Sequence, residues 1–224
     1  MMNNFKPGKF AARDSQTERL AERHLAKPLE VTSCGLGIKI FGGVYKTSAD
    51  TELMAKTVKI NSNQSFLEVG CGAGVVSIIL SKSAKSGIGT DINELAVRNS
   101  EFNARWYKVK NVQFIKSDLF KNVHGKFDVI ICNPPYNNLS ANDDVDKMFW
   151  DASNEMKQRF FEEVGNYLND NGCIYFGWAN FSDLDLDLPF RLAQKNNLEI
   201  IDVKSKLSPH RACTFYVLKI KKIE

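Results

Sequence analysis

The distribution of apolar and polar residues changes character near residue 65. From there on, short apolar runs alternate with longer segments in which apolar side chains recur every three or four positions. The short runs predict β-strands and the longer segments predict α-helices. The expected strands are residues 65–70, 86–91, 111–116, 127–132, 172–177, 198–203 and 212–220, and the expected helices are residues 73–84, 92–107 and 145–169. This alternating order predicts an α/β fold with a parallel sheet covered by helices on both faces.

The last two predicted strands follow each other too closely for a parallel arrangement. Only the short segment 204–211 separates them. A parallel crossover needs roughly a dozen residues or more, whereas an antiparallel pair needs only a short loop. We therefore expect residues 198–220 to form an antiparallel hairpin at the C-terminal end of the sheet.

The first 60 residues follow a different pattern. The polar segment 11–30 predicts a helix that ends near Pro28, and residues 37–46 predict a hairpin around Gly42 and Gly43. Residues 47–50, TSAD, resemble the start of a helix that continues through residue 60. Since we find no repeat or low-complexity linker, we expect residues 1–60 to cap a main domain formed by residues 61–224.

The composition limits the class of protein but does not indicate a particular reaction or ligand. A chain of 224 residues with 43% hydrophobic residues can form one domain with a substantial core. It contains no apolar run of the ~20 residues that a membrane helix needs, and its first residues lack a secretory segment, so a cytoplasmic protein is expected. The five scattered cysteines predict reduced thiols and no metal site. A net charge of +4 permits a nucleic-acid partner without indicating one.

The segment LEVGCGAG, residues 67–74, joins a predicted strand to a predicted helix. Gly70, Gly72 and Gly74 permit a tight turn and a close approach of a ligand to the backbone. The spacing differs from the GxGxxG of dinucleotide-binding folds, and Glu68 precedes the loop. A carboxylate there would repel a pyrophosphate but suit a cationic ligand. A simple strand–helix turn is the alternative explanation of the glycines.

Two further acids follow the next two predicted strands. Asp91 can accept hydrogen bonds from both hydroxyls of a ribose, and its alternative role is to cap the helix that follows. Asp118 can accept from an adenine amino group, with Ile92 and Leu119 as apolar walls, and its alternative is a surface turn. Together with the glycine loop, these acids predict a site for a ligand that carries a positive charge, a ribose and an adenine.

The fourth predicted strand ends in Asn133-Pro134-Pro135-Tyr136. The prolines fix φ and remove two N–H donors, so the turn is stiff. The Asn133 side chain and a nearby backbone carbonyl are two acceptors, which match the two hydrogens of an NH2 group. The Tyr136 ring offers a surface against which a planar group can stack. Two such acceptors can hold a weakly nucleophilic nitrogen in line with an electrophilic methyl group.

The ordered motifs LEVGCGAG, GTDIN, SDLF and NPPY resemble those of the class I S-adenosylmethionine-dependent methyltransferases that carry an NPPY motif. The resemblance implies a Rossmann-like, mostly parallel sheet of seven strands and the cofactor S-adenosyl-L-methionine. It implies that Glu68 and the glycine loop bind the methionine part, Asp91 the ribose and Asp118 the adenine. The cofactor-binding residues so implied are Glu68, Gly70, Cys71, Gly72, Gly74, Asp91, Ile92, Ser117, Asp118, Leu119 and Asn133, and the catalytic ones are Asn133, Pro134 and Tyr136.

The NPPY turn is shared by methyltransferases of glutamine side chains and of adenine N6 or related exocyclic amines. Two features favour a glutamine-bearing, translation-related protein as the partner. Only residues 137–148 separate the turn from the next helical pattern, which leaves no room for a large DNA-reading insertion. The segment before the glycine loop, with Thr51 and Glu52, is similar to that of release-factor glutamine methyltransferases. RNA or DNA adenine stays the alternative substrate, and a catalytically silent binding module is the alternative of another class.

Overall fold

The computed structural model describes residues 27–181, 185–208 and 213–223. Most of the helix predicted over residues 11–30 lies outside these ranges. Residues Leu29–Ser33 at its end form strand β1, which pairs with β2 (Leu36–Ile40) in a separate two-stranded sheet.

The main sheet has seven strands in the order β5-β4-β3-β6-β7-β9-β8. Neighbouring strands are parallel except for β9, which runs antiparallel to both β7 and β8. The predicted parallel sheet with a C-terminal antiparallel hairpin is confirmed. The strands are β3 (Ser65–Val69), β4 (Ser86–Asp91), β5 (Val112–Lys116), β6 (Phe127–Cys132), β7 (Leu168–Ala179), β8 (Leu198–Leu207) and β9 (Thr214–Lys222).

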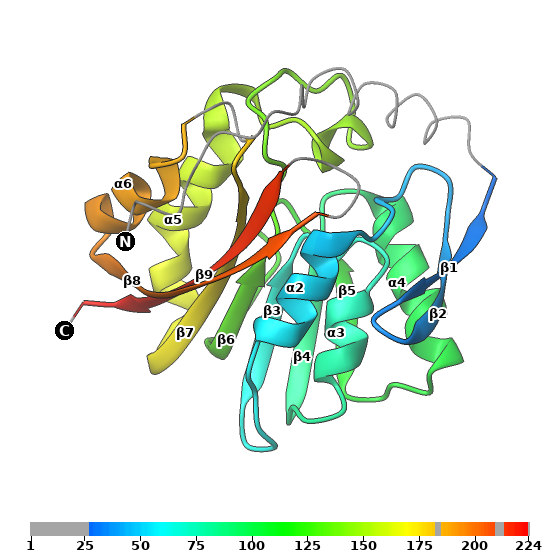
Figure 1. Cartoon of the computed structure of the whole chain (residues 1–224). Helices are drawn as coiled ribbons and strands as arrows, with labels where there is room; N and C mark the ends of the chain where they lie inside the picture. Colours follow the sequence, from blue (N-terminus) through cyan, green and yellow to red (C-terminus); the bar gives the residue numbers. More distant parts are fainter. Residues whose placement is uncertain (1–26, 182–184, 209–212, 224) are drawn as a thin grey trace.

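Helices cover both faces of this sheet. Figure 1 shows α2 and α3 in front of the sheet, while β9 passes in front of α5. The apolar core of the larger cluster contains the central strands together with residues of α2, α5 and α6. The helices are α2 (Ala49–Thr57), α3 (Val75–Leu80), α4 (Glu94–Trp106), α5 (Glu155–Tyr167) and α6 (Leu188–Lys195), with 3-10 turns at Asp146–Met148 and Ala152–Asn154.

The helix predicted over residues 145–169 is wrong at its start, because α5 begins only at Glu155. Ser153 and Asn154 both have φ in the left-handed region, at 54° and 58°, so the helix cannot extend backwards through them. The Asp151 carboxylate accepts the backbone N–H groups of Met156 and Lys157 at 2.7 and 3.2 Å, and so satisfies the first turn of α5. The preceding residues form a loop instead.

The hairpin predicted over residues 37–46 is also wrong in its position along the chain. The observed hairpin is β1–β2, and it turns at Cys34 and Gly35, whose φ values are 53° and 79°. Alternate residues of β2 are buried against the domain. The turn therefore contains a cysteine in the left-handed region. Turn-prone residues such as Asn, Asp and Gly usually mark this position, so the sequence did not predict a turn at Cys34. Helix α6 has no counterpart among the predicted elements, and the helix predicted over 73–84 ends at Leu80.

The hairpin is tied to the main domain by the polar face of α4. The Asn99 side chain accepts the N–H of Phe41 at 2.8 Å and donates to the carbonyl of Lys39 at 2.7 Å. The Asn103 amide donates to the carbonyls of both Lys39 and Ala73, at 2.9 Å each. One helix thus holds the hairpin and the glycine loop together.

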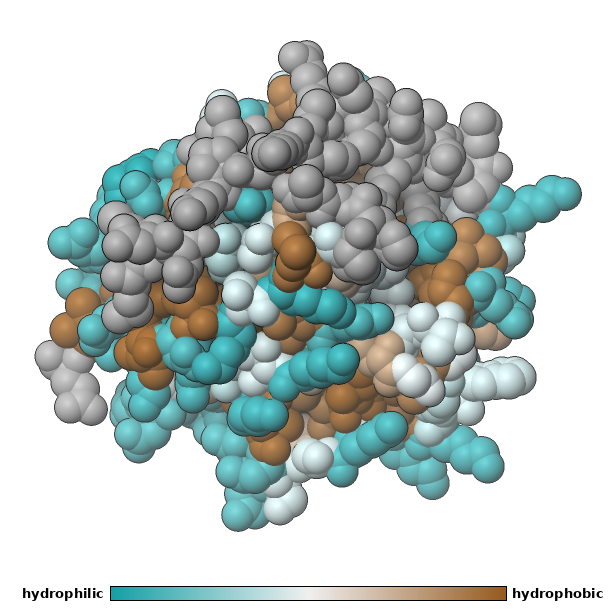
Figure 2. All heavy atoms as spheres, in the orientation of Figure 1, coloured by the Kyte–Doolittle hydropathy of each residue, from teal (hydrophilic) through white to brown (hydrophobic). Residues whose placement is uncertain are grey.

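The surface is of mixed character. Figure 2 shows hydrophilic side chains projecting around much of this face, with apolar residues between them. None of the helices in the described part of the chain is long and apolar enough to cross a lipid bilayer.

Candidate active site

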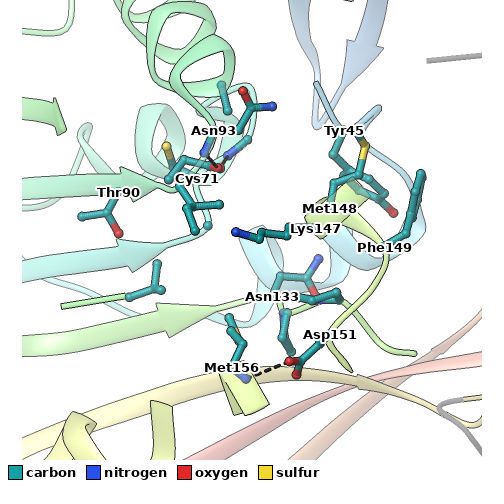
Figure 3. Close-up of a pocket in the computed structure, with 18 of the residues that line it drawn as sticks. Tyr45, Cys71, Thr90, Asn93, Asn133, Lys147, Met148, Phe149, Asp151 and Met156 are labelled. Atoms are coloured by element: carbon teal, nitrogen blue, oxygen red, sulfur yellow. Dashed lines mark hydrogen bonds between the residues drawn. The ribbon is translucent and has the colours of Figure 1, made fainter. Parts of the chain in front are cut away.

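A cavity of about 420 Å³ lies over the carboxyl ends of β3, β4 and β6. This is the edge of a parallel sheet at which ligands bind in folds of this architecture. Its wall contains every predicted site residue except Gly74, together with Asp50, Asp144, Lys147, Phe149 and Asp151, which the sequence did not single out. Figure 3 shows Asn133 and Lys147 inside this cavity, with Met148 and Phe149 on the same side as Tyr45.

The glycine loop has the backbone conformation that the sequence predicts. Gly70, Gly72 and Gly74 have φ values of 79°, 55° and 81°, which side-chain-bearing residues rarely adopt. The amides of Gly70 and Cys71 both donate to the Thr90 carbonyl at 2.8 Å, and this anchors the loop to β4.

Gly74 has a packing role rather than a place in the cavity wall. A Cβ atom added there would lie 3.0 Å from the Cβ of Ser100 on α4. Gly74 therefore allows the start of α3 to approach α4 closely. Cys71 does line the cavity, but its thiol is buried and lies 3.3 Å from the Ser100 hydroxyl.

Glu68 lies at the end of β3 and is 6% exposed. Its carboxylate accepts the backbone N–H of Ser77 at 2.9 Å and also the Ser77 hydroxyl. Burial nevertheless raises the pKa of Glu68 to about 8, so the carboxyl is largely protonated at neutral pH. A cation placed beside it would favour the ionised form, which is the behaviour expected of a group that binds a sulfonium or an ammonium.

Asp91 caps the start of α4, as one of its two predicted roles requires, and it also contacts the glycine loop. One carboxylate oxygen accepts the Asn93 N–H at 2.9 Å at the start of α4, and the other accepts the Gly72 N–H at 3.0 Å. A carboxylate has about four acceptor sites, so the group keeps capacity for a ribose hydroxyl. Burial raises the pKa of Asp91 to about 6.

The residues expected around an adenine lie together at the end of β5. Ser117, Asp118 and Leu119 line the cavity with Ile92. Asp118 also forms an ion pair with Arg159 of α5 at 3.1 Å, which the sequence did not predict. An adenine amine would have to share this carboxylate with the guanidinium. The Ser117 hydroxyl accepts the Asn122 N–H at 3.0 Å and fixes the turn.

The NPPY turn brings its asparagine to the cavity. Asn133 donates from its side-chain nitrogen to Asp50 at 2.9 Å, and its side-chain oxygen accepts the Tyr136 hydroxyl at 2.7 Å. Pro134 and Pro135 line the cavity beside it. The predicted acceptor is therefore present at the cavity wall, in a fixed orientation.

Tyr136 does not offer the open stacking surface that the sequence suggested. It is 6% exposed, and its ring packs against Trp178, Phe181 and Phe215 with centroid distances of 6.3, 5.5 and 6.0 Å. Its hydroxyl donates to Asn133 Oδ1, so Tyr136 helps to fix the orientation of that side chain. The apolar surroundings explain the change, because a ring enclosed by three aromatic side chains has little free face.

Sequence reasoning missed Asp50, whose side chain meets Asn133, and the loop residues Asp144 and Lys147, which pair at 3.0 Å. Asp50 was visible only as part of a helix start, 83 positions before Asn133. No local pattern connects residues so far apart in the chain.

A sheet of this strand order, with a glycine loop after β3, acids after β4 and β5 and an NPPY turn after β6, defines a Rossmann-like methyltransferase. The solved structure of ribosomal protein L11 methylase from Lactobacillus delbrueckii has the same fold, with a TM-score of 0.60, 22% identity and coverage of 83% of this chain and 84% of that one. The chain belongs to the methyltransferase small domain family, whose model matches residues 43–190. The predicted class of enzyme, a methyltransferase that uses S-adenosyl-L-methionine, is confirmed.

Two curated relatives are similar over most of the chain. One, named "Putative protein N5-glutamine methyltransferase" in Methanocaldococcus jannaschii, is 38% identical over 62% of this chain and 74% of its own length. The other, a release factor glutamine methyltransferase of Fusobacterium nucleatum, is 29% identical over 75% of this chain. The chain spans 52% of the length of this second relative.

Proposed function

We propose that this enzyme transfers a methyl group to the side-chain amide nitrogen of a glutamine in a translation-related protein. The observation that carries the proposal is the Asn133 amide, held by Asp50 and Tyr136 at the wall of the cavity. The names of the two relatives support a glutamine as the acceptor. Because translation takes place in the cytoplasm, a translation-related substrate would be methylated there.

We assign the cofactor to the cavity by the chemistry of its wall. Glu68 and the backbone of the glycine loop would hold the methionine part, and Asp91 would accept the ribose hydroxyls. Ile92 and Leu119 would enclose the adenine beside Asp118. When bound, S-adenosyl-L-methionine supplies an electrophilic methyl group on a positively charged sulfur, and the buried acid Glu68 is suited to that charge.

The protein's own contribution to the reaction is to bind and orient the amide. Asn133 Oδ1 and the Pro134 carbonyl would accept the two hydrogens of the glutamine NH2 group and aim its lone pair at the methyl group. Acceptors placed where positive charge develops on nitrogen stabilise the transition state. The nitrogen readily loses a proton after transfer, so no strong base is required. In the described part of the chain, no histidine lines the cavity.

The test is methyl transfer to a purified release factor from the same cells. With labelled S-adenosyl-L-methionine, we expect the wild type to label the factor, and peptide mass spectrometry to find an increment of about 14 Da on a glutamine. Asn133→Ala should lower the rate of labelling by about 100-fold or more, to a residual rate that can still be measured, while S-adenosylhomocysteine still binds in isothermal titration.

Extract treated with nuclease or with protease distinguishes the alternatives. Label that appears only in nuclease-sensitive material would identify a nucleic-acid amine as the acceptor instead of glutamine. Cofactor binding without transfer to either fraction would indicate a non-catalytic module.

A further inference from the structure

Asp50 is a buried carboxylate at the base of the NPPY turn. It is 4% exposed and lies in the first turn of α2. Besides the Asn133 amide at 2.9 Å, its oxygens accept the hydroxyls of Tyr45 at 3.1 Å and of Ser48 at 2.7 Å. A charge buried in this way is tolerated because donors surround it.

This carboxylate determines which way the Asn133 amide points. A carboxylate only accepts hydrogen bonds, so the Asn133 nitrogen must face Asp50 and the oxygen must face away. The oxygen lies over Gly177, where an added Cβ atom would come within 2.1 Å of it. Of the two lone pairs of this oxygen, Tyr136 uses one at 2.7 Å, and one stays available for a substrate N–H.

The same contact changes the strength of the acceptor. A negative charge hydrogen-bonded to an amide N–H draws electron density through the conjugated amide toward its oxygen. The effect is larger in a poorly solvated site, where charges are weakly screened. Asn133 Oδ1 therefore accepts more strongly than the oxygen of an isolated amide, and it is better suited to a nitrogen on which positive charge develops.

We propose that Asp50 is a positioning residue that orients and polarises Asn133 for recognition of the substrate NH2 group. This inference rests on the proposed function, because it assigns Asn133 the role of acceptor. The competing explanation is that Asp50 only stabilises the start of α2, where it accepts the Thr51 N–H at 2.8 Å.

Asp50→Asn tests the proposal with little change in volume. The new amide can donate to Asn133 Oδ1, which lets the Asn133 side chain turn and present its nitrogen to the substrate. We expect kcat for methylation of the release factor to fall about 100-fold or more, as when one stabilising group is removed from a transition-state site. KM for S-adenosyl-L-methionine should change less than about threefold. Glu52→Gln, on the same helix but paired with Lys206 at 2.6 Å, is the matched control and should keep wild-type kcat.

A double-mutant cycle separates positioning from mere stability. If Asp50 acts through Asn133, then Asp50→Asn should lower kcat no further in an Asn133→Ala background. Equal losses in both backgrounds, or a single variant within about threefold of the wild-type kcat, would overturn the proposal.

A measurement without substrate keeps this inference distinct from the proposed function. In nitrogen-15 NMR spectra, we expect one side-chain N–H proton of Asn133 to exchange slowly and to resonate downfield, and Asp50→Asn to remove both features. If the wild type fails to methylate the release factor, the proposed function is wrong, while this signature still decides whether Asp50 orients the amide. An Asn133 signal unchanged in Asp50→Asn would refute the inference whatever the substrate.

Discussion

Glu68 is the cavity residue whose protonation links the stability of the fold to pH. Its pKa in the folded protein is about 8, raised by burial, whereas the ordinary value is 4.5. Between these values the folded state holds a proton that the unfolded state has lost, so the free energy of unfolding falls as pH rises.

We expect Glu68→Gln to gain stability relative to the wild type as pH rises from 5 to 8. The gain should be at most about 1.4 kcal/mol per pH unit. Urea denaturation of both proteins without cofactor measures it. A stability difference that does not depend on pH in this range would show that Glu68 keeps an ordinary pKa.

Gly177 provides a way to displace Asn133 without altering it. A methyl group at position 177 would lie 2.1 Å from Asn133 Oδ1 and 3.3 Å from Asn133 Cα. The end of a side chain can move at low cost, so we expect Gly177→Ala to unfold within a few degrees of the wild type but to lose methyl transfer by about 100-fold, as misplacement of a catalytic group by 1 Å can do. Thermal denaturation and initial rates test this. A fully active variant would show that the Asn133 position is unimportant.

The sequence was informative at this scale only where chemistry coincided with a local pattern. Glu68, Asp91 and Asn133 follow strands directly, so their place at one sheet edge could be predicted, and they do line one cavity. Asp50 and Arg159 reach the site from other elements and depend on tertiary packing. The roles assigned to these residues stay predictions until variants are measured.

At the scale of elements, the start of α5 joins folding to the site. Asp151 lines the cavity, accepts two backbone N–H groups of α5 and pairs with Lys157 at 2.8 Å. Lys157 is 1% exposed. The carboxylate thus satisfies a helix end and a buried ammonium at once.

We expect Asp151→Ala to lower the free energy of unfolding by about 3 kcal/mol or more, since it leaves a buried ammonium without this carboxylate. Asp170→Ala, at an exposed position of β7, is the control and should change stability by less than about 0.5 kcal/mol. Chemical denaturation compares the two. Similar small effects in both variants would mean that the buried pair contributes little.

The elements that the sequence predicted well were those with a strong and regular pattern. Strands 86–91 and 127–132 match β4 and β6 at both ends. The helix predicted over 145–169 was wrong at its start because a helical spacing of apolar residues continues through a loop that two left-handed residues create. The β1–β2 hairpin was misplaced because glycines after β2 gave a stronger turn signal than Cys34 and Gly35.

At the scale of the whole molecule, ligand binding should stabilise the fold. The cavity draws its wall from β3, β4, the segments after β5 and β6, and α5. A ligand that binds only the folded state adds about 2.7 kcal/mol to the free energy of unfolding at 100 times its Kd. We expect S-adenosylhomocysteine to raise Tm by several degrees in the wild type. Asp91→Ala should shift much less at the same concentration, and an equal shift would place the ribose elsewhere.

The overall topology could be predicted because it depends on element order rather than on detail. Alternation of strands and helices gave the parallel sheet, and the short connection before residue 212 gave the antiparallel β9. The seven strands of the main sheet correspond to the seven apolar runs, and the resemblance implied the same number. How residues 1–60 and 61–224 divide the molecule is still a prediction.

The bonds of Asn103 to both Lys39 and Ala73 have a consequence for how the protein responds to its ligand. A ligand that reduces the motion of the glycine loop should also reduce the motion of α4, which is hydrogen-bonded to the β1–β2 hairpin. The backbone amides of β2 would then exchange hydrogen for deuterium more slowly, although β2 does not line the cavity. The exchange rate of β2, a strand outside the cavity, would then report whether a ligand is bound.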